Sequence, residues 1–250
     1  MSGHSKWNNI MHKKAKTDAQ RAKVFTKIGR EISMAVKAGG PDPASNTKLG
    51  TLIAKAKSNN VPNDNIERLI KKASGADNTD NYEDITYEGY GPCGVAVIVE
   101  TLTDNRNRTA GDMRHYFDKN GGNMGQSGSV SWMFTKKGII LIDGEDVDGD
   151  ELMMCALDAG ATDFAEDEGV FEITTEPNDV YTVKEALEKA GYTVSSAEAS
   201  MIPSTYVKVE GERADGESNI KLMSRLLEML EDNDDVQNVW HNVENAEDVE

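Results

Sequence analysis

The sequence lacks long apolar runs, is poor in cysteine and contains none of the common catalytic motifs. Its longest apolar runs, Val95–Val99 and Gly138–Ile142, are far shorter than the ~20 residues that span a bilayer. Two cysteines, Cys93 and Cys155, are too few for a disulfide framework or a zinc cluster. The four histidines form no close pair, and no HExxH, CxxC or GxSxG motif occurs. We therefore expect a cytoplasmic, non-enzymatic protein without a membrane span, a metal or a cofactor.

Charge is divided unevenly along the chain. The net charge is −17, yet residues 1–75 hold 15 Lys and Arg against five Asp and Glu, a net charge of +10. Residues 76–250 hold the other 12 basic residues and 39 acidic ones, a net charge of −27. Such asymmetry favours an anionic partner, in particular nucleic acid, for the basic part. The acidic remainder would repel that partner and could instead meet a basic protein.

Helical periodicity dominates the basic part. Residues 1–16 show no apolar period, and we interpret them as a flexible basic arm. Apolar residues then recur at helical spacing over Asp18–Ala38, over Ala44–Ser58, and from Asp64 to a stop at Gly75. Asp64 with Glu67 resembles a capping box for the third helix. Three short helices are therefore expected, followed by a polar, acidic linker over residues 76–84.

Strand patterns follow the linker. Ile85–Tyr90 and Val95–Leu102 flank a glycine-rich turn and predict a hairpin. The following residues predict a β-α-β-β-α-β pattern, which is the ferredoxin-like order. The elements are strand 138–142, helix 150–159, strand 162–166, strand 170–174, helix 180–190 and strand 192–199. The flanking pieces give the same order if they join across this block: strand 95–102, helix 109–119 with Thr109 and Asp112 as its cap signature, strand 129–134, strand 205–210, helix 218–232 and strand 236–241.

These patterns predict a multidomain α+β protein. Its N-terminal three-helix domain would be followed by two ferredoxin-like α/β domains, the last one inserted into the middle one. The expected boundaries are residues 1–78 for the basic arm and helical domain, 79–135 plus 202–245 for the middle domain, and 136–201 for the inserted domain. Two sequential domains that share no sheet are the alternative.

The basic part offers two groups of candidate nucleic-acid contacts. At ~100° per residue, one stripe about 80° wide on the first helix carries Lys16, Lys23, Lys27, Arg30 and Lys37. The preceding arm adds Lys6, Trp7, His12, Lys13 and Lys14, in which Trp7 offers a stacking surface or packs against the helices. A solvated lysine face, common on amphipathic helices, is the alternative for the stripe.

Three further motifs are less specific. Arg106 and Arg108 stand at the start of a predicted helix, where free backbone N–H groups favour anions. The segment is interpreted as a phosphate site, or alternatively as a turn followed by an exposed first helical turn. Gly121–Gly128 lacks the Lys-Ser/Thr ending of a phosphate loop and is better explained as a tight turn. Asp143–Asp150 lacks the glycine that a calcium loop requires at its sixth position and is interpreted as an acidic loop before a helix.

Several segments are specific in combination: Gly3–Trp7, His12–Lys16, Lys27–Ile32, Gly39–Pro43, Pro62–Arg68, Tyr87–Pro92, Thr103–Thr109 and Gly121–Asn123. With them the chain closely resembles the YebC/PmpR family, which includes mitochondrial translational activators of cytochrome oxidase. The resemblance covers nearly the whole chain. Two departures are Cys93, where the hairpin usually has Gly, and Lys48, which replaces a usual Arg and cannot make its bidentate bond to phosphate.

The resemblance implies a helical N-terminal domain, two α/β domains and a non-enzymatic function. Family members are described as DNA-binding transcriptional regulators, and also as ribosome-associated factors that help translation through difficult sequences such as proline runs. The first description makes this chain a regulator that binds duplex DNA. The second makes it a translation factor bound to ribosomal or transfer RNA. Both remain open at the level of sequence.

Overall fold

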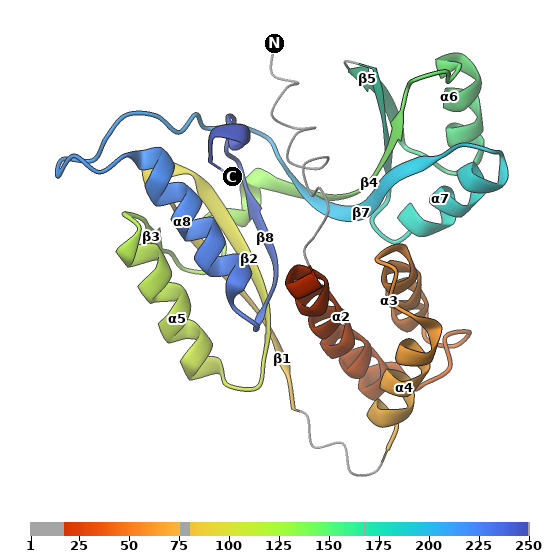
Figure 1. Ribbon diagram of the computed structural model, residues 1–250, viewed down its shortest axis with the longest axis horizontal. Coiled ribbons are helices and arrows are strands. Elements are labelled where there is room, and N and C mark those ends of the chain that lie inside the picture. Colours follow the sequence, from red (N-terminus) through yellow and green to blue (C-terminus); the bar gives the residue numbers. More distant parts are fainter. Residues whose placement is uncertain (1–17, 76–80, 168, 250) are drawn as a thin grey trace. The chain divides into compact units, whose positions relative to one another are not determined.

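The computed structural model describes residues 18–75, 81–167 and 169–249 (Figure 1). The chain divides into two compact units. One contains the chain up to Met133 together with Pro203–Glu250, and the other is Phe134–Ile202. The expected boundaries of three domains stay a prediction.

The three predicted helices are present in the first unit. They are α2 (Asp18–Gly39), α3 (Thr47–Ser58) and α4 (Asn63–Ala73). Their apolar faces form one buried cluster, which includes Ile28, Ile32, Leu49, Leu52 and Ile66. The periodicity of these residues therefore produces the helical core that it predicts.

The starts of two of these helices differ from the prediction. The side chain of Asn46 accepts from the N–H of Leu49 and donates to the carbonyls of Ala35 and Gly40. This cap ties α3 to the end of α2, so α3 starts later than Ala44. The predicted capping box of α4 is wrong, since that helix starts after Pro62 without a side-chain cap.

A four-stranded sheet completes the first unit. Its strands are β1 (Glu83–Tyr90), β2 (Ala96–Thr103), β3 (Asn123–Met124) and β8 (Val236–His241), in the order β3-β1-β2-β8. Strands β1 and β2 pair antiparallel from Glu83–Thr103 to Tyr90–Ala96, which confirms the hairpin.

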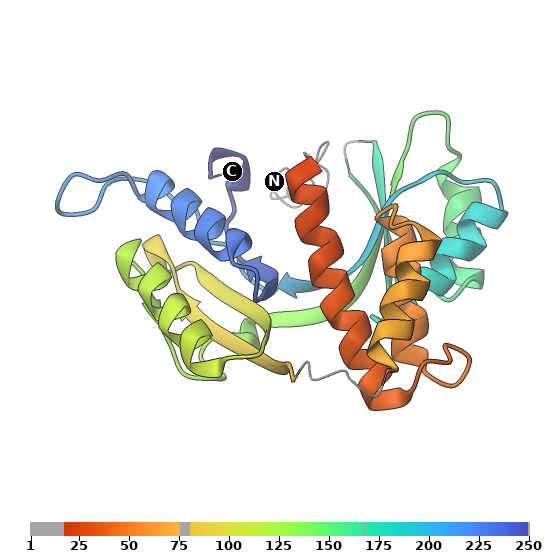
Figure 2. The ribbon, with the colours of Figure 1, turned by 60° about the horizontal axis from the view of Figure 1, so that its bottom comes forward.

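Two helices cover one face of this sheet. Figures 1 and 2 show α5 (Arg106–Lys119) and α8 (Asn219–Asp232) side by side against it. Val97 and Val99 point to that face and pack with Met113, Phe117 and Leu226 in one core. The alternation along β2 thus places the helices on one side of the sheet.

The strands predicted over residues 129–134 and 205–210 are wrong, so the flanking pieces do not form the ferredoxin-like order. Residues 131–133 form a short 3-10 turn before β4 begins at Phe134. The backbone N–H of Val209 donates to Asn245 Oδ1 at 2.8 Å, and the Val209 carbonyl accepts from Asn245 Nδ2 at 2.9 Å. Within residues 205–210 the only β pairing described is one isolated parallel bridge between Val207 and Val243, and it does not extend into a strand.

The second unit has the predicted β-α-β-β-α-β order. Its elements are β4 (Phe134–Asp143), α6 (Gly149–Asp158), β5 (Asp163–Asp167), β6 (Val170–Thr175), α7 (Val180–Lys189) and β7 (Val194–Pro203). The sheet order is β5-β6-β4-β7, and both helices pack on one core with Ile140, Ile142 and Ile173. Asp148 in the acidic loop caps α6 by accepting from the N–H groups of Asp150 and Glu151.

The described residues contain neither a membrane-spanning helix nor a metal cluster. None of the helices that the structure describes is long and apolar enough to cross a membrane. Within the same residues, no group of three or more His, Cys, Asp or Glu is placed to hold a metal ion.

The hairpin turn holds a strained cysteine. Cys93 has a φ of 59°, and Gly94 follows with a φ of 79°. A side chain in the left-handed region costs about 1–2 kcal/mol, a cost that glycine avoids. The turn therefore keeps a conformation suited to glycine although this chain carries Cys93.

We predict that Cys93→Gly raises the free energy of unfolding by up to about 1 kcal/mol, because the relief of strain exceeds the entropy that glycine adds to the unfolded chain. Urea denaturation measures the change. Cys93→Ala is the matched control, since it removes the thiol and keeps the strain. Equal stability of the two variants would contradict the strain argument.

A histidine on β8 links stability to pH. Burial lowers the pKa of His241 to about 4. Its Nδ1 accepts a hydrogen bond from the N–H of Val243 at 3.3 Å, which requires the unprotonated nitrogen. The folded protein therefore keeps a neutral imidazole in mild acid, whereas the unfolded chain takes up a proton near pH 6.5.

We predict that the free energy of unfolding falls as the pH drops from about 6.5 to about 4, because the unfolded state binds a proton that the folded state excludes. His241→Asn keeps a polar side chain and should flatten this part of the profile. Urea titrations at a series of pH values test it. An unchanged profile in His241→Asn would rule out His241 as the cause.

Candidate nucleic-acid interface

Half of the residues predicted to bind nucleic acid are described by the structure. Four lie on α2 and two on α5: Lys23, Lys27, Arg30, Lys37, Arg106 and Arg108. The predicted contacts of the basic arm lie outside the described residues: Lys6, Trp7, His12, Lys13, Lys14 and Lys16.

The stripe on α2 meets the acidic end of α8. The Lys23 ammonium forms an ion pair with Asp232. The Lys27 Nζ donates to the carbonyl oxygen of Glu231 at 3.2 Å. Lys37 is exposed in the last turn of α2. These cations therefore stay at least partly exposed to solvent, and two of them also contact the chain's own acidic segment.

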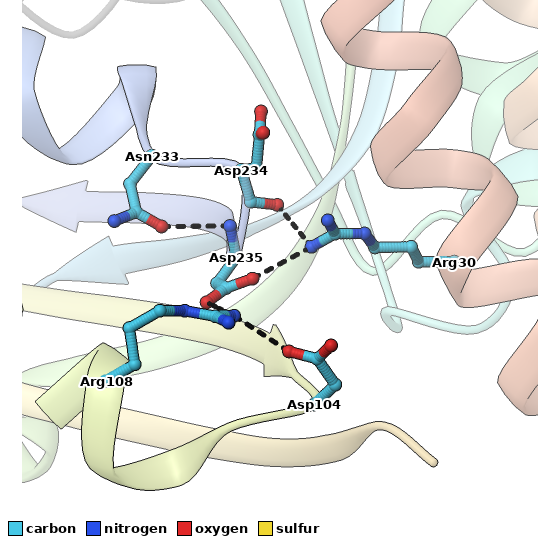
Figure 3. Close-up of a pocket in the computed structure, with 6 residues that line it drawn as sticks. All are labelled: Arg30, Asp104, Arg108, Asn233, Asp234 and Asp235. Carbon is cyan, nitrogen blue, oxygen red and sulfur yellow. Dashed lines mark hydrogen bonds and ion pairs between the residues drawn. The ribbon is translucent and has the colours of Figure 1, made fainter. Parts of the chain in front are cut away.

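Arg30 makes the most extensive of these contacts (Figure 3). Its Nη1 donates to the Asp234 carbonyl at 2.7 Å and to Asp235 Oδ1 at 3.1 Å. The guanidinium also lies 5.4 Å from the centre of the Tyr82 ring, within the range of a cation–π contact. Arg30 thus serves as a structural anchor for α2.

The Asp235 carboxylate joins three elements. Its Oδ2 accepts from Arg108 Nη2 at 2.7 Å, from Thr109 Oγ1 at 2.8 Å and from Thr103 Oγ1 at 3.1 Å. Its other oxygen accepts from Arg30. Only 7% of this side chain is exposed. Burial alone would raise the pKa of Asp235, but the hydrogen bonds from Arg108, Thr109 and Thr103 hold it below its ordinary value.

The Arg108 guanidinium forms ion pairs with two carboxylates. It contacts Asp235, and it reaches Asp104 at 2.8 Å. These hydrogen bonds raise the pKa of the guanidinium further above its usual range. Arg108 is therefore not available as the predicted phosphate ligand without breaking both pairs. Arg106, two residues earlier, is exposed.

The start of α5 also differs from the prediction. Asn105 caps the helix by accepting from the Arg108 N–H at 3.1 Å, and the helix begins at Arg106. The predicted cap at Thr109 is wrong, because the Thr109 hydroxyl bonds to Thr103 and Asp235 instead.

These groups line a cavity of about 380 Å³ (Figure 3). Its lining contains two guanidiniums and three carboxylates, from Arg30, Asp104, Arg108, Asn233, Asp234 and Asp235. The carboxylates outnumber the cations, so the cavity carries no excess positive charge for a phosphate. The arrangement holds elements together and does not favour an anionic ligand.

Other cations on the helices are exposed, and the sequence analysis did not count them among the candidate nucleic-acid contacts. Lys57 lies in the last turn of α3, and Lys71 and Lys72 lie in the last turn of α4. Lys48 is exposed in the first turn of α3. None of the four forms an ion pair with another residue that the structure describes. A signal was present in the sequence, since lysines gather at the ends of both predicted helices.

Comparison with known proteins gives matches over nearly the whole chain. A family model described as "TACO1/YebC protein N-terminal domain" matches residues 5–76, and one described as "TACO1/YebC second and third domain" matches residues 82–243. A "Probable transcriptional regulatory protein" of Caldicellulosiruptor bescii is 57% identical over 99% of this chain and 100% of its own length. A protein of the same description from Ruminiclostridium cellulolyticum is 60% identical over 100% of this chain and 99% of its own.

A solved structure is also similar. The crystal structure of a conserved hypothetical protein from Aquifex aeolicus has a TM-score of 0.77 and 45% sequence identity. The match covers 96% of each chain.

We predict that Asp235→Asn lowers the free energy of unfolding by about 1–3 kcal/mol, because it leaves buried hydrogen-bond donors without a charged partner. The folded pKa of Asp235 lies below the unfolded value, so its contribution is complete above about pH 4 and is lost as the pH falls through the folded pKa. The difference between the two proteins should therefore shrink in acid.

Asp234→Asn is the matched control for Asp235→Asn. Asp234 takes part through its carbonyl oxygen, and its side chain is exposed. Urea denaturation of both variants compares the same charge change at neighbouring positions. If the two variants lost equal stability, the Asp235 carboxylate would not be the junction that its contacts indicate.

Proposed function

The chain belongs to the TACO1/YebC family, and on that premise we propose that it is a non-enzymatic regulator of gene expression that binds nucleic acid through residues 1–75. Its relatives are named probable transcriptional regulatory proteins, which supports a DNA-binding transcriptional regulator as the first candidate.

The division of charge is the observation that carries this proposal. Residues 1–75 have a net charge of +10, although the whole chain has −17. Phosphate contacts supply most of non-specific nucleic-acid affinity. A basic module on an acidic body can therefore bind a polyanion with one end while the other end is repelled.

The structure suggests which described cations contact phosphate first. Lys23, Lys27 and Arg30 contact the acidic end of α8. A phosphate must displace an internal partner to reach them. Lys57, Lys71 and Lys72 are exposed at helix ends and need no such exchange. We assign the phosphate contacts of the described part to these exposed lysines, together with the predicted residues of the arm.

The proposed binding mode is weakly sequence-specific. Lysine contacts phosphate as a point charge, whereas base edges are read by Arg, Asn and Gln. The exposed cations at the ends of α3 and α4 are lysines. The contacts therefore position the nucleic acid more than they select a sequence.

A ribosome-associated translation factor is the second candidate, and the bipolar charge favours it. The basic part would contact ribosomal or transfer RNA, and the acidic units could meet basic ribosomal proteins. Naked duplex DNA offers a partner to the basic part alone. The second unit is strongly acidic, because residues 134–202 hold only four Lys against 17 Asp and Glu.

Replacing Lys71 and Lys72 by Gln should weaken binding to nucleic acid and reduce the slope of log affinity against log salt by about 0.7–0.9 for each phosphate that is no longer neutralised. Fluorescence anisotropy over a salt series measures both quantities. Lys189→Gln with Lys208→Gln is the matched control, since it removes the same charge from the acidic part. Equal weakening in both double variants would show an effect of net charge and contradict the assigned contacts.

The two candidate functions separate in cell extract. A translation factor should co-sediment with ribosomes at low salt and leave them as salt rises. A transcriptional regulator with these lysine contacts should bind its promoters in gel-shift assays at physiological salt, with a small but measurable preference over random DNA. Failure in both assays would overturn the proposal.

A further inference from the structure

One segment of the acidic part contains no carboxylate. Residues 76–250 hold 39 Asp and Glu, so an acid occurs on average about every four to five residues. No Asp or Glu stands between Asp118 and Asp143. Electrostatic repulsion of a polyanion is therefore weakest along this segment, which includes the glycine-rich stretch Gly121–Gly128.

The segment exposes a tryptophan. Trp132 has 73% of its surface exposed, the largest value among the large hydrophobic residues that the structure describes. The other two exposed residues of this kind, Met154 and Leu157, lie on α6 in the second unit. Within the described part of its own unit, Trp132 is thus the one large hydrophobic residue that is strongly exposed.

A buried carboxylate shapes the loop that carries this tryptophan. Glu88 is only 5% exposed. Its oxygens accept from the N–H groups of Gly128 at 2.7 Å, Val130 at 2.8 Å and Ser131 at 2.8 Å. Burial alone would raise the pKa of Glu88, but these three donors hold it below its ordinary value. The Glu88 charge is therefore engaged by the loop backbone.

The indole itself is held by the loop. The Trp132 Nε1–H donates to the Ser129 carbonyl at 3.1 Å. The Tyr90 hydroxyl donates to the same oxygen at 3.1 Å. The polar edge of the ring is thus bound while most of its surface stays exposed. An aromatic ring fixed in this way loses little conformational entropy when a flat ligand stacks on it.

We propose that Trp132 is a stacking platform for an unpaired nucleobase, on the loop Gln126–Met133. Every base has a π face, and stacking on aromatic side chains is the usual way in which proteins hold unpaired bases. The exposed neighbours Gln126 and Ser127 are neutral groups that can bond to base edges. The platform rests on the proposed nucleic-acid function and deepens its second candidate, because unpaired bases occur in structured RNA and not in a regular DNA duplex.

The surroundings favour a base over a protein side chain. Protein interfaces usually bury several apolar residues around an aromatic anchor. In the described part of its unit, Trp132 has no second exposed large hydrophobic residue to form such an anchor region. The missing carboxylates fit an anionic partner and give no advantage to a basic protein.

The test compares Trp132→Ala, Trp132→Phe and wild type for binding to a fluorescein-labelled single-stranded RNA and to the same sequence as a duplex. Trp132→Ala should weaken single-strand binding by about 5- to 150-fold, the range expected for one stacked base. Trp132→Phe should restore most of the affinity. The salt slope should stay unchanged, because the same number of phosphates is neutralised. Met154→Ala is the control for removal of an exposed hydrophobic side chain.

Other results overturn the platform. Wild-type affinity in Trp132→Ala would exclude it, even if that variant failed to bind a protein partner. Equal weakening for the single strand and the duplex would show a backbone contact instead of stacking. If wild type bound neither probe at low salt, the proposed function and the platform would both fail. If wild type bound and Trp132→Ala kept full affinity, the platform alone would fail.

Discussion

The carboxylate of Asp235 is the group on which the first unit depends. It is almost fully buried, and it receives donors from the end of β2, the first turn of α5 and the middle of α2. The donors come from three different elements, so one charge fixes three backbone segments at the end of the sheet. A buried carboxylate is tolerated only with such complete pairing. The helical domain is thereby tied to the sheet by a cation, Arg30, that the sequence places on its basic stripe.

This junction changes how the charge of the chain serves its function. The basic stripe and the acidic end of α8 neutralise each other in part, through Lys23 and Asp232 as well as through Arg30. In the proposed function, the positive charge presented to a partner then comes from lysines at other helix ends, such as Lys57 and Lys71. In the acidic part, the segment that carries Trp132 has no carboxylate of its own, and the proposed base contact lies there. Phosphate contact and base contact are thus assigned to separate parts of one unit.

Much of this fold follows from the spacing of residues, and the remainder depends on contacts distant in sequence. Helical spacing gives the core of α2, and alternation gives the β1–β2 hairpin, because both patterns are local. The loop at residues 128–131, which leads into the 3-10 turn, depends on Glu88, which lies 40 to 43 residues earlier. Helical spacing also locates the basic stripe, but its partner Asp232 is 209 residues from Lys23. Charge pattern predicts that a face is basic and cannot predict whether the chain itself supplies the acid.

Ultraviolet crosslinking in cells, with mass spectrometry of the crosslinked peptides and sequencing of the recovered DNA and RNA, tests the central claim most directly. The account predicts crosslinks in residues 1–75 and in the loop around Trp132, with few in residues 143–202, where carboxylates are dense. Ribosomal and transfer RNA among the reads would identify a translation factor, and promoter DNA would identify a transcriptional regulator. Crosslinks concentrated in the acidic second unit, or none above background, would contradict the account.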